Sequence, residues 1–448
     1  MKKQFHPPVK SLKIISLFDS DLSRISKTIF FFSLFVILYF LLFSVRIPLD
    51  YGDDVAFVKA SVSFEWLMQR YKGWTSRIIL DAITVTLCHH PFLFRFLCAL
   101  CLFSLPLLVR MVILDICGKD RTEAILPHYF IFSIFFLFPL KTFHSAGFIT
   151  TICNYLFPLY LVFASYVMLS RLKGFGLKDI CLATIATLAL IIAANQELLA
   201  ALMFQSSILC LIFNFKRKGA ILFLIVASLS LYFTITCDGN GIRFLKELRW
   251  IEDYSDWNTP YKIYMGIITT VHYYLFCRNT ICVFVVMTML MCTTGKLKVS
   301  ILGGIVMLIF QIIVHIWIGR GDTYFLGKNF SFSISGTIGT FWTALFIIFM
   351  IYLFYKLEIK RSIKIFLGLM VACAVCDRVL MGFSPTIFAS STRTFLFTDH
   401  ALVLYVIVIS ILSNKISRRD FSCILLTSLI LQFALQGGKI YKLLIGSW

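Results

Sequence analysis

Residues 28–45 read TIFFFSLFVILYFLLFSV, and this run decides the fold class of the chain. It carries no charge, and at about 1.5 Å per residue a helix of this length crosses most of the roughly 30 Å of membrane hydrocarbon. The leader before it is basic and holds Lys2, Lys3, Lys10, Lys13, Arg24 and Lys27. No small-residue cleavage site separates the leader from the run, so we expect the run to stay as a membrane anchor.

Composition extends this conclusion to the whole chain. Of 448 residues, 59% are hydrophobic and 14% are charged, and the mean hydropathy is +0.89. A water-soluble globule cannot cover its surface with so few polar residues. We expect an all-α polytopic bundle of about 11–13 spans, forming one integral membrane domain over residues 1–448. The expected spans lie at about 28–46, 92–114, 126–140, 154–170, 179–195, 198–214, 219–236, 279–294, 299–318, 335–355, 364–381, 398–413 and 421–436.

The basic residues behind the net charge of +20 lie largely in the loops between these spans. Basic residues cluster in five short connections: Arg171, Lys173 and Lys178; Lys216, Arg217 and Lys218; Lys296 and Lys298; Lys356, Lys360, Arg361 and Lys364; Lys415, Arg418 and Arg419. Because cytoplasmic loops carry the excess of Lys and Arg, these loops and the amino terminus are predicted to be cytoplasmic. The membrane and its lipids thereby explain the excess of basic over acidic residues. We therefore expect no nucleic-acid partner.

Two longer segments, 47–91 and 237–278, fall on the opposite side. They mix aromatic, acidic and basic residues in stretches too polar to span. Apolar residues recur at helical spacing in the first segment: Val58, Val62 and Trp66, and Phe57, Phe64 and Met68. We therefore expect short amphipathic helices on the outer surface.

Asp53 and Asp54 stand in Tyr51-Gly52-Asp53-Asp54, a few residues after the first span. A carboxylate here is suited to take a proton from an attacking hydroxyl or to bind a divalent cation. Adjacent side chains diverge, so the two are not expected to share one role. An equally weighted alternative is that one of them caps a helix starting near Val55.

Arg77 ends the segment Gly73-Trp74-Thr75-Ser76-Arg77. Its planar guanidinium can hold a phosphate. The alternative, which is favoured when Arg77 is taken alone, is an ion pair with Asp81 four residues later.

Three further groups of polar residues lie in other outer connections: Lys141, His144, Thr150 and Asn154; Asn195, Gln196 and Glu197; Ser384, Thr386 and Arg393. Ionisable groups so close to hydrocarbon are costly and usually belong to a site. Simpler roles stand beside this one, namely a tight hairpin at Glu197 with Asn195 capping the next helix, a histidine that satisfies a carbonyl, and an arginine that snorkels. All these residues fall opposite the basic loops, which predicts one outward-facing cavity.

The pattern resembles the GT-C glycosyltransferases that use polyprenyl-phosphate sugars, in particular the serotype-converting O-antigen glucosyltransferases of bacteria and phages. The matching stretches are Gly52-Asp53-Asp54, Gly73-Trp74-Thr75-Ser76-Arg77, 145–156, Asn195-Gln196-Glu197, and Phe383-Ser384-Pro385 with Arg393. The resemblance implies a hexosyltransferase that moves glucose from a polyprenyl phosphate to a lipid-linked polysaccharide, facing the periplasm from the bacterial inner membrane. It also implies an upstream donor-synthesising enzyme and a flippase.

In that reading Asp53, Asp54 and Glu197 are catalytic. Positive charge for the leaving lipid phosphate comes from Arg77, Lys141 or Arg393. Other residues that bind substrate are His144, Asn154 and Trp74. A divalent cation, Mg²⁺ or Mn²⁺, is a candidate cofactor at the carboxylates.

Two rival functions remain at this stage. A transporter or flippase of lipid-linked glycans would favour ionisable residues at the membrane midplane and a repeat between halves, and the sequence has neither. An O-antigen ligase or polymerase also handles lipid phosphate on the outer face. The carboxylate pair in the first outer loop argues against that second rival.

Overall fold

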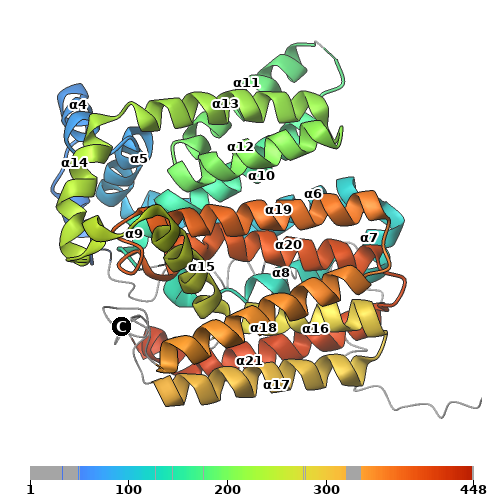
Figure 1. Cartoon of the computed structure of the whole chain (residues 1–448). Helices are drawn as coiled ribbons and strands as arrows, with labels where there is room; N and C mark the ends of the chain where they lie inside the picture. Colours follow the sequence, from blue (N-terminus) through green and yellow to red (C-terminus); the bar gives the residue numbers. More distant parts are fainter. Residues whose placement is uncertain are drawn as a thin grey trace, which may run out of the picture.

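The computed structural model describes residues 33, 49, 51–126, 128–143, 145–174, 176–275, 277, 279–318 and 334–445. The first expected span, 28–46, lies outside this part apart from Ser33, and so does His144. The described chain is a bundle of helices without a strand (Figure 1). The expected all-α, polytopic class is therefore confirmed.

Seven helices in the described part are long and apolar enough to cross a membrane, or eight if one bent pair is counted as a span. The seven are α6 (Pro91–Cys117), the continuous run Phe148–Ser170, α11 (Leu177–Ala194), α13 (Arg217–Ile235), α17 (Leu297–Ile318), α19 (Arg361–Val379) extended to Phe383, and α20 (Leu396–Leu412). The bent pair joins α15 (Thr259–Leu275) to α16 (Thr280–Thr294) at 81°. The total of 11–13 spans stays a prediction.

Four other helices complete the membrane-facing part. They are α5 (Ile78–His89), α12 (Glu197–Ile212), α18 (Ile334–Lys356) and α21 (Arg418–Ile445). A short helix, α7 (Lys119–Ile125), follows α6 at the end of the bundle that holds the basic loops (Figure 1).

The structure departs from the expected spans in two places. Residues 126–140 form only α8 (His128–Phe135), whose eight residues are too short to span, followed by a turn and η2 (Leu140–Phe143). Pro139 disfavours helix at the residue before it, which accounts for the break. In the expected outer segment 237–278, α15 is not a surface helix: Gly266 lets its backbone meet the carbonyl of Val379 at the end of α19.

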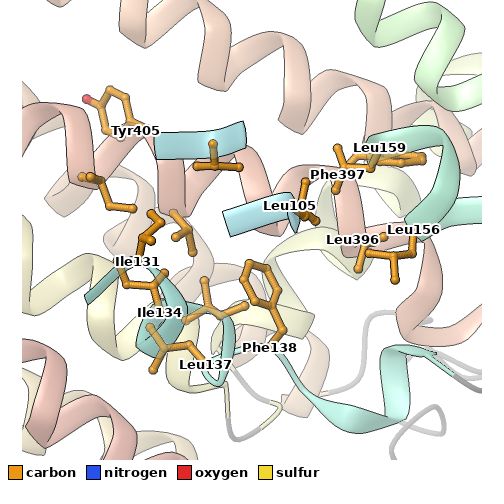
Figure 2. Close-up of a cluster of buried hydrophobic side chains, with 14 of the residues drawn as sticks. Leu105, Ile131, Ile134, Leu137, Phe138, Leu156, Leu159, Leu396, Phe397 and Tyr405 are labelled. Atoms are coloured by element: carbon orange, nitrogen blue, oxygen red, sulfur yellow. The ribbon is translucent and has the colours of Figure 1, made fainter. Parts of the chain in front are cut away.

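The core forms where α6, α8, α10 (Phe157–Ser170) and α20 meet (Figure 2). Leu105, Ile131, Ile134 and Phe397 are at most 1% exposed there. Lipid tails are as apolar as these side chains, so close packing rather than water exclusion holds such helices together. The turn after α8 is tied to the same core through Leu137 and Phe138.

The polar elements gather at one end of the bundle. Figure 1 places α4 (Phe64–Gly73), α5, α9 (Phe148–Thr151) and α14 (Asp238–Glu247) together, opposite the turns that join α11 to α10 and α12 to α13. Contacts at the other end agree, since Lys216 pairs with Asp115 at 2.9 Å and Lys415 pairs with Glu358 at 2.8 Å. The charge pattern of the loops therefore predicted which segments share an end.

The side of the membrane that each end faces is testable by labelling. We expect Glu65→Cys and Asp253→Cys, both exposed at the polar end, to react with an impermeant maleimide on spheroplasts. Lys178→Cys and Lys298→Cys, exposed at the basic end, should react only after the membrane is opened. The background should lack the exposed Cys181 and Cys376. Reversed labelling would place the polar end in the cytoplasm and favour a nucleotide-sugar donor.

Candidate functional site

Two of the motifs found in the sequence interlock at the polar end. The backbone N–H of Asp53 donates to the carbonyl of Ala146 at 2.7 Å. Gly52 has φ +62°, and a Cβ there would lie 2.6 Å from that same carbonyl oxygen. A side chain at Gly52 would therefore be strained in its backbone and would also push the two segments apart.

Asp54 holds this junction from inside. It is fully buried, and its carboxylate accepts hydrogen bonds from the N–H of Ile149 (3.0 Å), the N–H of Thr150 (2.8 Å) and the hydroxyl of Thr150 (2.5 Å). These donors begin the helical run Phe148–Ser170, where backbone N–H groups have no partner inside the helix. Asp54 thus caps a helix remote in sequence, and the expectation that it caps its own helix is wrong.

Asp53 is exposed, whereas its neighbour Asp54 is buried. It occupies the N-cap position of α3 (Asp54–Val58), but its side chain makes no capping hydrogen bond. Partial burial raises the pKa of Asp53, and the positive charges of Arg393, Arg70 and Arg77 act against that rise. The expected inequivalence of the two carboxylates appears here as one structural and one accessible side chain.

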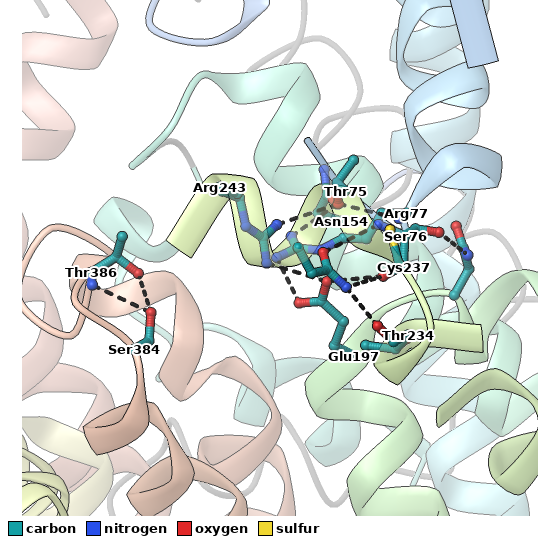
Figure 3. A network of polar contacts seen from close by, with 12 residues as sticks. Thr75, Ser76, Arg77, Asn154, Glu197, Thr234, Cys237, Arg243, Ser384 and Thr386 are labelled. Carbon is teal, nitrogen blue, oxygen red and sulfur yellow. Dashed lines mark hydrogen bonds and ion pairs between the residues drawn. The ribbon is translucent and has the colours of Figure 1, made fainter. Parts of the chain in front are cut away.

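Glu197 is the centre of a charged network (Figure 3). Its carboxylate pairs with Arg77 at 3.0 Å and with Arg243 at 3.4 Å, and it accepts a hydrogen bond from the hydroxyl of Ser76 at 3.2 Å. These partners come from the start of α5 and from α14, whereas Glu197 begins α12. One carboxylate thereby joins three segments that are far apart in the sequence.

Two asparagines orient the segment before Arg77. The side-chain oxygen of Asn195 accepts from the N–H groups of Ile79 and Leu80, each at 3.1 Å, and its amide donates to the carbonyl of Ser76. Asn240 on α14 exchanges hydrogen bonds with Ser76 from the other side. Asn195 therefore caps α5.

The cap of the next helix, α12, is Gln196, whose side chain accepts from Leu199 at 2.7 Å. The expectation that Asn195 caps this helix is wrong. The tight hairpin itself is present, because α11 ends at Ala194 and α12 begins at Glu197.

The alternative pairing of Arg77 with Asp81 is also wrong. Asp81 accepts from Nε of Arg70 at 2.7 Å, which ties α4 to α5. Arg77 instead pairs with Glu197 and donates to the side-chain oxygen of Asn154 at 3.5 Å. Its Nε is buried and has no hydrogen-bond partner among the described residues. Asn154 lies in the π-helical turn Ile152–Leu156, a local widening that is frequent at functional sites.

The remaining expected residues fall at or beside the network. Trp74 ends α4, and the ammonium group of Lys246 lies 5.8 Å from the centre of its ring. Arg393 lies on η7 (Ser391–Phe395), close enough for its charge to act on Asp53 and Glu247. Ser384 and Thr386 bond one another at 2.8 Å within their own loop. The side chain of Lys141, like all of His144, lies outside the described part.

Sequence reasoning assigned no role to Arg243 and Asn240, which complete the network. Both lie on α14, in a run that begins Asp238-Gly-Asn-Gly and reads as a turn. Gly239 permits helix there because it packs against α4, where a Cβ would lie 2.4 Å from the carbonyl oxygen of Tyr71. The signal that could have identified Arg243 is an isolated arginine in a polar outer segment.

An open hollow of about 710 Å³ lies against Arg243 and Asn240 and is also lined by Glu197, Thr234 and Cys237.

The described residues do not supply a metal site. No group of three or more His, Cys, Asp or Glu side chains gathers among them. Asp54 uses its oxygens on Ile149 and Thr150, so the pair with Asp53 cannot chelate a cation jointly. The candidate Mg²⁺ or Mn²⁺ therefore has no described ligand set, and no step below depends on it.

Comparison of the chain with protein-family models, with curated proteins and with solved structures gives no match. The functional argument therefore rests on the geometry of this site and on the chemistry of its residues.

The structural role of Asp54 leads to a stability prediction. Asp54→Ala should lower the free energy of unfolding by about 1–3 kcal/mol, because it leaves buried donors of Ile149 and Thr150 unpaired. Thermal unfolding of the purified protein in detergent would measure this. The exposed neighbour gives the control: Asp53→Ala should stay within about 0.5 kcal/mol. Equal midpoints for the two variants would contradict the assignment.

Proposed function

We propose that this protein is a GT-C type glycosyltransferase that moves glucose from a polyprenyl-phosphate donor to a lipid-linked O-antigen polysaccharide on the periplasmic face of the inner membrane. One observation carries the proposal: the accessible carboxylate of Asp53 lies within electrostatic reach of Arg70, Arg77 and Arg393 at one end of a membrane bundle. A base beside cations suits the transfer of a group from a lipid phosphate to a hydroxyl.

Asp53 is the proposed general base. A hydroxyl of the acceptor sugar gives its proton to Asp53 while its oxygen attacks the anomeric carbon, and the bond from that carbon to the phosphate oxygen breaks. This direct displacement inverts the anomeric configuration. A raised pKa strengthens a carboxylate as a base.

Arg393 is the proposed ligand of the departing phosphate. Among the described residues it forms no ion pair within 4 Å, whereas Arg77 and Arg243 share Glu197. A guanidinium outside such pairs can turn both N–H groups of its fork to a phosphate. Arg77 supports it with charge and with its buried Nε, which has no hydrogen-bond partner among the described residues.

Glu197 is proposed to position Arg77 and Arg243 rather than to accept a proton, since both guanidinium groups favour its ionised form. Trp74 and Asn154 border the same network and are proposed to contact the sugars. Lys141 and His144 stay proposed substrate ligands. A donor-synthesising enzyme and a flippase are the proposed upstream partners.

The distribution of charge within the apolar helices supports an enzyme over a transporter. Asp377 and Arg378 stand at the end of α19, and Asp399 stands near the start of α20. Both places lie at the polar end of the bundle, whereas a transporter is expected to place such groups near the midplane. Mass spectrometry of surface polysaccharide with and without this protein tests the proposed function. An unchanged glycan would contradict it.

The proposed base is tested by Asp53→Asn. We expect transfer from polyprenyl-phosphate glucose to fall about 10²–10⁴-fold, because the amide cannot take the proton, while the protein inserts and unfolds normally. Asp253→Asn is a matched control, since this aspartate is also exposed and lies in the second outer segment, 237–278. Near-full transfer by the Asp53 variant in membranes would refute the base assignment.

The role of Arg393 is tested by two substitutions with different consequences. Arg393→Lys keeps the charge and loses the fork, so turnover at saturating donor should fall at least about tenfold with an unchanged pH profile. In Arg393→Gln a charge that lowers the pKa of Asp53 is removed, so the acidic limb of the profile should move to higher pH.

The direction of this pH shift follows from the role of Asp53 as a base. Asp53 works as the carboxylate, so the rate is lost as pH falls through its pKa, which lies above the ordinary value of about 3.9. Arg249→Lys, an exposed arginine of the same outer segments, should leave rate and profile unchanged. Wild-type turnover for Arg393→Lys would mean that this arginine only contacts lipid headgroups.

A further inference from the structure

A second feature of the bundle is independent of the polar end. A cavity of about 550 Å³ lies between α6, α10, α12, α13, α19 and α20. Its walls are mostly aliphatic and aromatic and include Val162, Leu202, Phe223, Met370 and Leu404. The walls belong largely to helices that are apolar enough to span, so the surrounding solvent is hydrocarbon and a water-soluble ligand is disfavoured.

The cavity is a slot that runs along the helices. Its lining extends from Leu199 to Cys210 on α12 and from Phe397 to Val408 on α20. Eleven helical steps on each correspond to about 16 Å. Half of a hydrocarbon core of about 30 Å is about 15 Å, so the slot has the length of one lipid chain in one leaflet.

The two ends of the slot differ in polarity. At the end near the polar network, the slot is lined by the buried apolar residues Leu159, Leu199 and Phe397. All the cationic lining residues, Lys216, Arg217 and Lys218, stand at the other end. Lys216 is paired with Asp115, whereas Arg217 and Lys218 are exposed and make no ion pair within the described part of the chain.

We propose that this slot binds one acyl chain of an anionic phospholipid, whose phosphate lies on Arg217 and Lys218. The apolar walls bury the chain, and the two cations attract a negative headgroup at the surface where the slot opens. This lipid lies with its phosphate at the end opposite Asp53 and Arg393. The site is therefore separate from the proposed donor site, and the inference does not rest on the proposed function.

The membrane span expected at 28–46 is a poor occupant of the slot, because its basic leader would place further positive charge beside Arg217 and Lys218.

Native mass spectrometry of the delipidated full-length protein tests the proposal with phosphatidylglycerol and phosphatidylcholine of the same chains. We expect one phosphatidylglycerol to be retained about tenfold more strongly than phosphatidylcholine. Arg217→Gln with Lys218→Gln should reduce that retention to the level of phosphatidylcholine, since each cation near the surface contributes to anionic-lipid binding. The matched control is Lys296→Gln with Lys298→Gln, two exposed lysines of another basic loop that do not line the slot.

The position of the chain is tested separately. Ala401 lines the slot, and Ala401→Trp should abolish retention of the first lipid of either kind by filling the slot. If that variant does not fold, a phosphatidylglycerol with a photoreactive group at its chain end should label the wild-type protein on α19 and α20 around Met370 and Phe397. Equal retention of both lipids, equal loss in the control variant, or labelling spread over the exposed face of α17 would overturn the proposal.

Discussion

The hydrogen bonds from Ile149 and Thr150 to the buried carboxylate of Asp54 fix the first outer segment at the polar end of the bundle. They satisfy N–H groups at the start of a membrane-spanning helix, a place where unpaired donors are costly. They also clamp the first outer segment against the bundle and leave Asp53 facing outward.

Glu197 joins separate segments through arginine side chains, as Asp54 does through backbone N–H groups. Its carboxylate gathers Arg77 and Arg243 from two separate segments, and the asparagines around Ser76 hold the junction in register. Three segments that are far apart in the sequence are thereby joined through charge-assisted hydrogen bonds. Such a network keeps positive potential at the membrane surface without like-charge repulsion, as a phosphate-handling site requires.

The bundle separates its charges along its length. The network of Glu197, Arg77 and Arg243 occupies one end, and the basic turns occupy the other, where Arg217 and Lys218 line the apolar slot. We have proposed transfer from a lipid phosphate at the first end and binding of an anionic lipid at the second. Both proposals follow from one principle: a cation close to hydrocarbon is costly unless an anion pairs with it.

Local sequence determined the class, most helices and the grouping of polar segments, because hydrophobic length and loop charge act through the membrane and need no tertiary contact. It also singled out Asp53, Arg77, Glu197 and Arg393 as candidate site residues. Which acid is structural, which residue caps which helix, and the part played by Arg243 were decided only by the tertiary structure. The cap of α5 by Asn195, the structural role of Asp54 and the part played by Arg243 depend on hydrogen bonds or ion pairs between residues 46 to 116 positions apart, and no local spacing records such a contact.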